Sequence, residues 1–313
     1  MFHAVISDTH SPKPWNTSIK YFKKLVQKYP LIDCLVMNGD ILTNMSMDGS
    51  ILHPNKIVSK EQKKEYLQLG SPVFFEKFER LGIITNEMVI GYVKERYDWA
   101  YNELKNISKI KKTIFNLGNH ESEFQLLVLR ELVYLTDTDE SIINTVSKLA
   151  VKEIIKDFEK RLYELEKTSD FHYIRNKPLI IDDTMIMGIP GISHATVGND
   201  PTARFQEDHT KFLINQVNKN IHNVSKLIIY NHTQGNYDKK TGKFDCASPS
   251  LKNFMMNLPS NITKKIFVQS HNHWSYTQFM NHSGFDYVVN NAGLHAGLFN
   301  LIEFSNDTNV FHA

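Results

Sequence analysis

The chain has 313 residues, of which 41% are hydrophobic and 22% charged, so it can bury the core of one large domain or of two smaller ones. Its 36 basic and 34 acidic residues give a formal charge of +2, which argues against a global electrostatic attraction to nucleic acid or to anionic membranes. The two cysteines, the start without a secretory leader and the lack of any apolar stretch of about 20 residues argue against a disulfide framework and predict a cytoplasmic chain with no membrane partner.

Short apolar runs alternate with helical patterns along the chain, which favours an α/β architecture. Six runs are expected to form strands, at residues 3–8, 33–40, 113–119, 185–191, 226–232 and 265–273. Helices fit between them, because Ile19, Phe22, Val26 and Tyr29 share one helical face and the segment 93–107 repeats the same spacing. After Tyr276 the pattern suits antiparallel strands that close the domain.

Two segments interrupt this alternation, and we expect them to be insertions in a single domain that spans residues 1–313. The longer insertion, at about residues 121–167, is helical throughout and has apolar residues at three- and four-residue spacing. The shorter one, at about residues 44–75, follows Asp40. The helical insertion is interpreted either as a surface hairpin that only packs on the domain or as a cap over a site, since it begins directly after His120.

Polar side chains follow the apolar runs at the point where each run ends. Because ligands bind at the carboxyl ends of the strands in open α/β sheets, we expect these side chains to converge on one pocket. The residues are Asp8, His10, Asp40, Asn119, His120, His232, His271 and His273.

Four imidazoles, two carboxylates and one asparagine carbonyl from this set make seven nitrogen and oxygen donors with no thiolate. Such a set suits Mn²⁺, Fe or Zn²⁺ rather than a cysteine-based structural zinc site. Seven donors are too many for one tetrahedral metal, but they suit two metals if one carboxylate bridges them. Two metals about 3.5 to 4 Å apart are a common arrangement for in-line displacement at phosphorus.

The order Asp-x-His, Gly-Asp, Gly-Asn-His-Glu, His and His-x-His resembles the calcineurin-like metallophosphoesterase superfamily. The five blocks occur in the order of that family and extend from Asp8 to His273, which is most of the chain. The chain departs from the family at Ser270, where a glycine usually precedes the first histidine of the last block. This change affects the turn and leaves the donor set intact.

The resemblance implies a four-layer α/β/β/α sandwich and a specific division of roles. It implies that one metal is held by Asp8, His10 and His273, that the other is held by Asn119, His232 and His271, and that Asp40 bridges the two. His120 would then stand beside the substrate as the catalytic residue that contacts the phosphoryl group or protonates the leaving oxygen.

The resemblance also implies a metal-dependent phosphoric ester hydrolase in which a metal-bridging water or hydroxide attacks phosphorus. The cofactors would be two divalent ions, with Mn²⁺ preferred and Fe or Zn²⁺ left open. The balanced charge favours a small-molecule or nucleotide phosphoester as substrate. A nucleic-acid phosphodiesterase is the alternative, and a non-catalytic scaffold on the same fold is the third hypothesis.

Two further residues are candidates for substrate binding. His194 and Arg204 follow the apolar run at residues 185–191, and the guanidinium fork of an arginine suits a phosphate group. The alternative interpretation is that both are surface residues without a role at the site.

Overall fold

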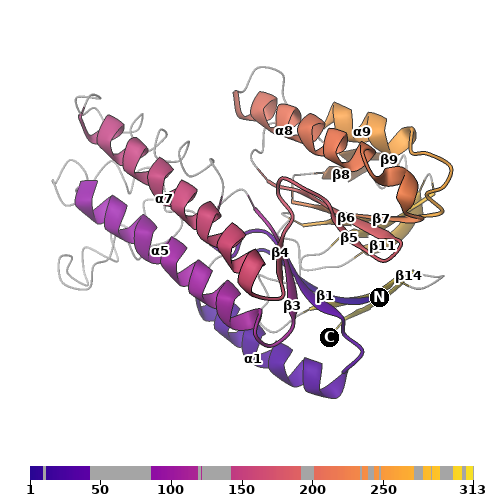
Figure 1. Ribbon diagram of the computed structural model, residues 1–313, viewed down its shortest axis with the longest axis horizontal. Coiled ribbons are helices and arrows are strands. Elements are labelled where there is room, and N and C mark those ends of the chain that lie inside the picture. The colour runs from indigo at the N-terminus through magenta and orange to yellow at the C-terminus, as the bar shows by residue number, and fades with distance from the viewer. Residues whose placement is uncertain are drawn as a thin grey trace.

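The computed structural model describes residues 1–9, 12–42, 86–118, 121, 142–191, 201–232, 235–238, 243–246, 248–270, 278–282, 284–289, 299–304 and 308–312. These residues form two six-stranded sheets, a small two-stranded sheet and the helices that cover them (Figure 1). No described helix is long and apolar enough to cross a membrane.

The first sheet, sheet A, consists of β1 (Phe2–Ile6), β2 (Cys34–Asn38), β3 (Lys112–Asn116), β4 (Phe171–Tyr173), β13 (Asn300–Phe304) and β14 (Thr308–His312). Its strand order is β14-β13-β1-β2-β3-β4. Strands β1 to β4 are parallel, whereas β13 and β14 complete the sheet with antiparallel pairing.

The second sheet, sheet B, consists of β5 (Leu179–Ile181), β6 (Thr184–Ile189), β7 (Lys226–Asn231), β10 (Lys264–Gln269), β11 (Gln278–His282) and β12 (Phe285–Val289). Its order is β11-β12-β10-β7-β6-β5, and the four central strands are parallel. Strands β8 (Gly235–Asp238) and β9 (Lys243–Cys246) form the two-stranded sheet.

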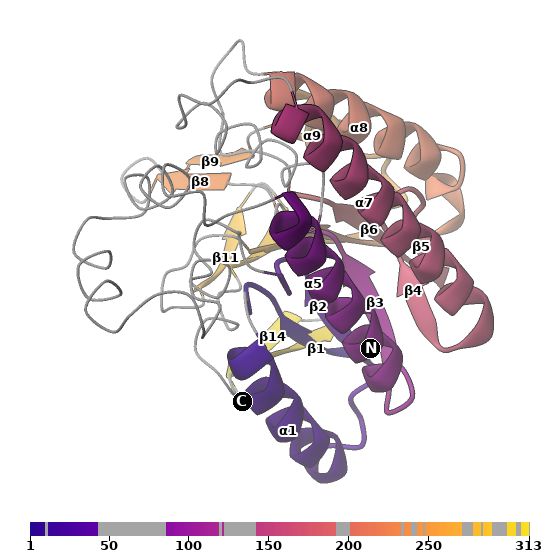
Figure 2. The same ribbon diagram turned by 90° about the vertical axis from the view of Figure 1, so that its left-hand side faces the viewer.

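Helices cover the outer face of each large sheet (Figures 1 and 2). Sheet A is covered by α1 (Pro12–Lys28), α5 (Asn86–Ile107) and α7 (Ile142–Thr168), and sheet B by α8 (Pro201–Asn218) and α9 (Pro249–Met256). A 3₁₀ turn, η1 (Ile221–Asn223), follows α8.

Side chains alternate along each strand, so each sheet has one face toward its helices and one face toward the other sheet. In β2, Leu35 and Met37 pack against the helices, whereas Cys34 and Val36 lie in a separate core between the two sheets. In sheet B, residues such as Val268 contribute to the same core between the sheets. The three apolar clusters therefore separate four layers in the order helix, sheet, sheet, helix, which confirms the predicted fold class.

All six predicted strands are present, as β1, β2, β3, β6, β7 and β10, and the predicted helices are α1 and α5. Antiparallel pairs also occur in the last part of the chain, as predicted. The segment 44–75 and residues 122–141 lie outside the described residues. The single-domain assignment and its two insertions therefore stay predictions.

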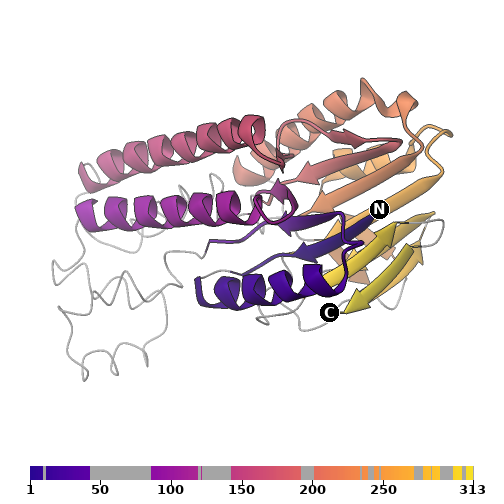
Figure 3. The same ribbon diagram turned by 60° about the horizontal axis from the view of Figure 1, so that its bottom comes forward.

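Helix α7 packs against α5 through buried side chains, including Tyr97 and Phe158, whose ring centroids are 5.0 Å apart. Leu162 and Leu165 are buried in the core that also contains Phe171 of β4, so the second half of α7 belongs to the outer layer over sheet A. Helices of 22 and 27 residues are about 33 and 40 Å long, whereas a five-residue strand spans about 17 Å. Figure 3 shows the first halves of α5 and α7 extending beyond the carboxyl ends of β1 and β2.

The core between the sheets holds a buried histidine that should make stability depend on pH. His3 is fully buried, and its Nδ1 lies 2.6 Å from the hydroxyl of Tyr230. Burial, with smaller effects of the amino terminus and Lys112, lowers the pKa of His3 from 6.5 to about 3. Between these two pH values the unfolded chain binds a proton that the folded chain does not bind, so stability falls as the pH drops through this range.

We therefore expect His3→Gln, which keeps a polar group near Tyr230, to flatten the pH dependence of the unfolding free energy between pH 6 and pH 4. The slope should decrease by up to about 1.4 kcal/mol per pH unit, whatever the absolute stability of the variant. Urea unfolding at several pH values measures the slope. Equal slopes in the two proteins would show that His3 takes up a proton in the folded state.

Candidate metal centre

The carboxyl ends of parallel strands from both sheets meet at one edge of the sandwich. The backbone N–H of Asp8, after β1, donates to the carbonyl of Gly39, after β2, at 3.0 Å. On sheet B, the N–H of His232, after β7, donates to Ile189 at the end of β6, at 2.9 Å. These contacts extend the strand pairing and hold the loops that carry the predicted site residues.

Asp8, Asp40 and His232 form a buried cluster at this edge. A potential ligand atom from each of the three residues lies within 4.8 Å of the other two. The Nε2 atom of His232 is 3.0 Å from Oδ2 of Asp40 and 3.9 Å from Oδ1 of Asp8. All three residues are at most 1% exposed, so their charges lie away from bulk solvent.

Both aspartates have a left-handed backbone conformation, which is uncommon for residues other than glycine. Asp8 has φ 54° and Asp40 has φ 55°, and Asp182 is the third non-glycine residue with positive φ among those described. Such conformations persist when surrounding structure enforces them, and they concentrate at functional sites.

Two glycines allow the loops to approach closely enough to build the cluster. A Cβ atom on Gly118 would lie 1.9 Å from Oδ1 of Asp40 and 2.3 Å from its backbone nitrogen. A Cβ atom on Gly39, which has φ 84°, would lie 2.5 Å from both Cα of Gly118 and Nδ1 of His232. The glycines of the Gly-Asp and Gly-Asn-His-Glu blocks are therefore needed for close packing around the two candidate ligands.

The protonation of His232 is set by its neighbours. Its Nδ1 lies 2.5 Å from the backbone oxygen of Asn38, so Nδ1 carries the hydrogen and Nε2 faces the two carboxylates. Burial alone would lower the pKa of His232, but the charges of Asp40 and Asp8 raise it to about 10. A bound cation would compete with the Nε2 proton, because a metal ligates the neutral imidazole.

Glu121 joins the loops that carry the predicted ligands, a role that the sequence did not reveal. Its Oε2 accepts hydrogen bonds from the N–H groups of Asp40 and Gly118, at 2.9 and 2.8 Å, and its Oε1 accepts one from Leu42, at 2.7 Å. Burial and then the nearby charge of Asp40 raise the pKa of Glu121 to about 8, while the backbone hydrogen bonds lower it. An acidic residue directly after Gly-Asn-His was the only signal, and its partners are set by the tertiary fold.

The structure thus brings together three of the seven predicted metal ligands. His10, Asn119, His271 and His273 lie outside the described residues, as do His120 and His194. Arg204 lies in α8, and its backbone alone is described. The assignments of these residues, and of Asp8, Asp40 and His232 as ligands, stay predictions.

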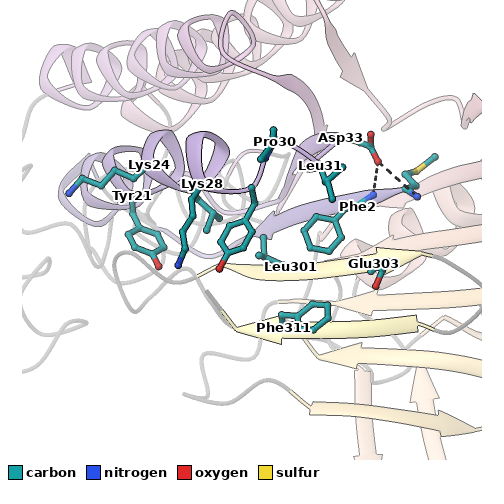
Figure 4. Close-up of a pocket in the computed structure, with 13 residues that line it drawn as sticks. Phe2, Tyr21, Lys24, Lys28, Pro30, Leu31, Asp33, Leu301, Glu303 and Phe311 are labelled. Carbon is teal, nitrogen blue, oxygen red and sulfur yellow. Dashed lines mark hydrogen bonds and ion pairs between the residues drawn. The ribbon is translucent and has the colours of Figure 1, made fainter.

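A groove of about 940 Å³ lies elsewhere, between α1 and the outer face of sheet A (Figure 4). Its lining includes Phe2, Tyr21, Lys24, Lys28 and Phe311. Phe2 begins β1, whereas Asp8 follows the other end of this strand, so the groove is separate from the cluster of Asp8, Asp40 and His232.

In motif order and in fold, the chain resembles the calcineurin-like metallophosphoesterase superfamily. No protein-family model and no curated protein matches its sequence. Similar solved structures include a putative 5′-nucleotidase from Staphylococcus aureus (10% identity, TM-score 0.45) and the NAD nucleotidase of Haemophilus influenzae (11% identity, TM-score 0.39). GAP50, described as the anchor in the inner membrane complex of Plasmodium, is another (10% identity, TM-score 0.43).

These comparisons cover the whole of this chain and 52%, 55% and 83% of the three proteins, respectively. The chain therefore spans about half the length of the two nucleotidases. Likenesses this weak establish no activity for it.

Proposed function

We propose that the protein is a metal-dependent hydrolase of phosphoric esters, with a small-molecule or nucleotide phosphoester as its substrate. The observation that carries this proposal is the buried cluster of Asp8, Asp40 and His232 at the carboxyl edge of the two sheets. These residues come from three different blocks of the motif order, and the fold brings a potential ligand atom of each within 4.8 Å of the other two.

The chemistry of the cluster fits a divalent cation. Burying two ionised carboxylates side by side is unfavourable in free energy unless positive charge lies between or beside them. His232 presents Nε2 to both carboxylates, and its Nδ1 is engaged by a backbone oxygen, as is usual for histidines that ligate metals. Oxygen and imidazole donors suit Mn²⁺, Fe or Zn²⁺, and we propose Mn²⁺ as the first choice.

The full set that would hold two ions adds His10, Asn119, His271 and His273 to these three residues, with Asp40 as the bridging ligand. Divalent ions bound there would supply Lewis acidity, which makes a water acidic and offsets negative charge on the phosphoryl oxygens. Protonation of the leaving oxygen is assigned to His120. His194 and Arg204 are assigned to binding of the substrate phosphate, where a guanidinium can form two parallel hydrogen bonds.

Selection among substrates is assigned to the helical insertion. The first halves of α5 and α7 extend beyond the carboxyl ends of β1 and β2, and they therefore flank the edge where the cluster lies (Figure 3). This position supports a cap formed by the segment at about residues 121–167. From Val151 onward α7 contributes buried side chains to the core over sheet A, so a test of the cap should leave that part of the helix in place.

The experiment that tests the function is a substrate panel on protein freed of metal and then reconstituted separately with Mn²⁺, Fe²⁺ or Zn²⁺. We expect two ions per chain by elemental analysis and metal-dependent hydrolysis of nitrophenyl phosphoesters or nucleoside monophosphates. Preferential cleavage of single- or double-stranded DNA would instead establish the nuclease alternative. A folded chain that binds no metal and cleaves none of these esters would refute the enzyme and leave the scaffold hypothesis.

A further inference from the structure

A pair of buried asparagines lies between the two sheets, directly beneath the cluster of Asp8, Asp40 and His232. Asn38 and Asn116 are the last residues of β2 and β3, they are partners in the sheet register, and both are fully buried. On these strands, Val36 and Ile114 belong to the apolar core between the sheets. Because side chains alternate along a strand, each inward-facing row ends in an amide.

Asn38 contacts strand ends of sheet B. Its own backbone oxygen accepts the hydrogen bond from Nδ1 of His232, at 2.5 Å. Its side-chain Nδ2 donates to the backbone oxygen of Asn231, at 3.2 Å, and to the hydroxyl of Ser270, at 2.8 Å. Asn38 also precedes Asp40 by two residues. It therefore links β2, which leads to Asp40, to the imidazole of His232 and to β7, which leads to His232.

Asn116 completes this connection. Its Nδ2 lies 2.9 Å from Oδ1 of Asn38, 3.0 Å from the backbone oxygen of Ile189 and 3.2 Å from that of Tyr230. Three oxygens around one nitrogen fix the orientation of the amide, because the reverse orientation would place oxygen against oxygen. Asn116 therefore joins β2 and β3 of sheet A to β6 and β7 of sheet B.

Apolar packing and this amide pair constrain the sheets differently. The core between the sheets is built mostly from valine and isoleucine side chains, and apolar contacts are non-directional, so they tolerate small shifts of one sheet over the other. Hydrogen bonds are directional, and a buried polar group that loses its partner pays its full desolvation cost. The separation of Asp40 on sheet A from His232 on sheet B is the distance that such a shift would change.

We propose that Asn38 and Asn116 are positioning residues that fix sheet A against sheet B beneath the cluster and thereby set its affinity for a divalent cation. The inference rests on the proposed metal site. Residues that orient metal ligands without touching the metal typically change affinity by about 10- to 100-fold when replaced. The alternative is that the pair contributes only to stability, like any buried polar contact between the sheets.

Asn116→Leu tests the proposal, because leucine has a similar branched shape and lacks the donor. Thr308→Val is the matched control. The hydroxyl of Thr308 in β14 donates to Asp286 in β12 at 2.6 Å, so this variant also loses a buried hydrogen bond between the sheets but does not touch the cluster. Asn116→Ser keeps one donor and leaves room for a water, so it serves as the milder variant should the leucine variant not fold.

The measurements are the dissociation constant for Mn²⁺ by calorimetry, the electron paramagnetic resonance spectrum of bound Mn²⁺ and the rise in melting temperature with Mn²⁺. We expect Asn116→Leu to weaken Mn²⁺ binding by about 10- to 100-fold and to change the spectrum, with a smaller loss in Asn116→Ser. Thr308→Val should bind Mn²⁺ like the wild type even though its melting temperature falls.

Wild-type Mn²⁺ affinity and spectrum in the folded Asn116 variants would overturn the positioning role while leaving the proposed function intact. If the wild-type chain itself binds no Mn²⁺, Fe²⁺ or Zn²⁺, then the proposed function fails and this inference fails with it.

Discussion

Asp40→Asn is expected to abolish tight metal binding and phosphoester hydrolysis together. The Asp40 carboxylate lies 3.0 Å from Nε2 of His232, and Asp40 is the residue proposed to bridge two ions. Asparagine has the same shape, but it replaces an ionised oxygen by a neutral NH₂ group that cannot bind a cation. The affinity should therefore fall by more than the roughly 10- to 100-fold typical of residues that only support a ligand.

Metal affinity by calorimetry and the melting temperature with and without Mn²⁺ measure this effect. In the wild type, Mn²⁺ should raise the melting temperature because it binds the folded chain. In Asp40→Asn this rise should vanish, whereas the metal-free variant should still unfold cooperatively. An unchanged rise in the variant would show that Asp40 is not a ligand.

Asp182→Asn is the matched control, because it makes the same chemical change at the same kind of backbone. Asp182 has φ 53°, close to the value of Asp40, and lies in the exposed turn between β5 and β6. Metal binding and hydrolysis should be unaffected in this variant. A loss in both variants would show that the effect is not specific to the carboxylate of Asp40.

The position of Asp8, Asp40 and His232 could be predicted because each follows a strongly apolar run. Both faces of these strands are buried, so the runs are continuous and end where polar residues begin, which makes the strand ends visible in the sequence. Parallel pairing then places the ends at one edge. The short strands β4 and β5 have three residues each, and runs of that length carry too little periodicity to be recognised.

The contacts of Asn38, Asn116 and Glu121 could not be predicted in the same way. The hydrogen-bond partners of the two asparagines lie 73 to 232 positions away in the chain. Leu42 and Asp40, whose N–H groups donate to Glu121, lie 79 and 81 positions from it. Such partners depend on the order of strands in each sheet and on how one sheet faces the other. In the sequence, an asparagine before Gly-Asp or near Gly-Asn-His is indistinguishable from a turn residue.

Gly118→Ala is expected to destabilise the fold and to weaken metal binding at the same time. The added methyl group would lie 1.9 Å from Oδ1 and 2.7 Å from Cγ of Asp40, and 2.3 Å from its backbone nitrogen. The backbone contact means that rotating the Asp40 side chain does not relieve the clash, so the loops after β2 and β3 must move apart. The carboxylate of Glu121 accepts hydrogen bonds from the N–H groups of both Gly118 and Asp40, and this movement would strain those hydrogen bonds as well.

Overpacking of this kind costs about 1 to 3 kcal/mol, and the backbone clash places Gly118→Ala at the upper end of that range or above it. Gly91→Ala is the matched control, because Gly91 lies in α5 and, apart from the backbone of its own helix and its chain neighbours, no atom of the described residues stands within 4 Å of the position a Cβ would take. Alanine there should stabilise the chain by up to about 1 kcal/mol, since it favours the helix over glycine. Urea unfolding and Mn²⁺ titration of both variants measure the contrast. A Gly118→Ala protein with wild-type stability and Mn²⁺ affinity would mean that the two loops do not approach as closely as the cluster requires.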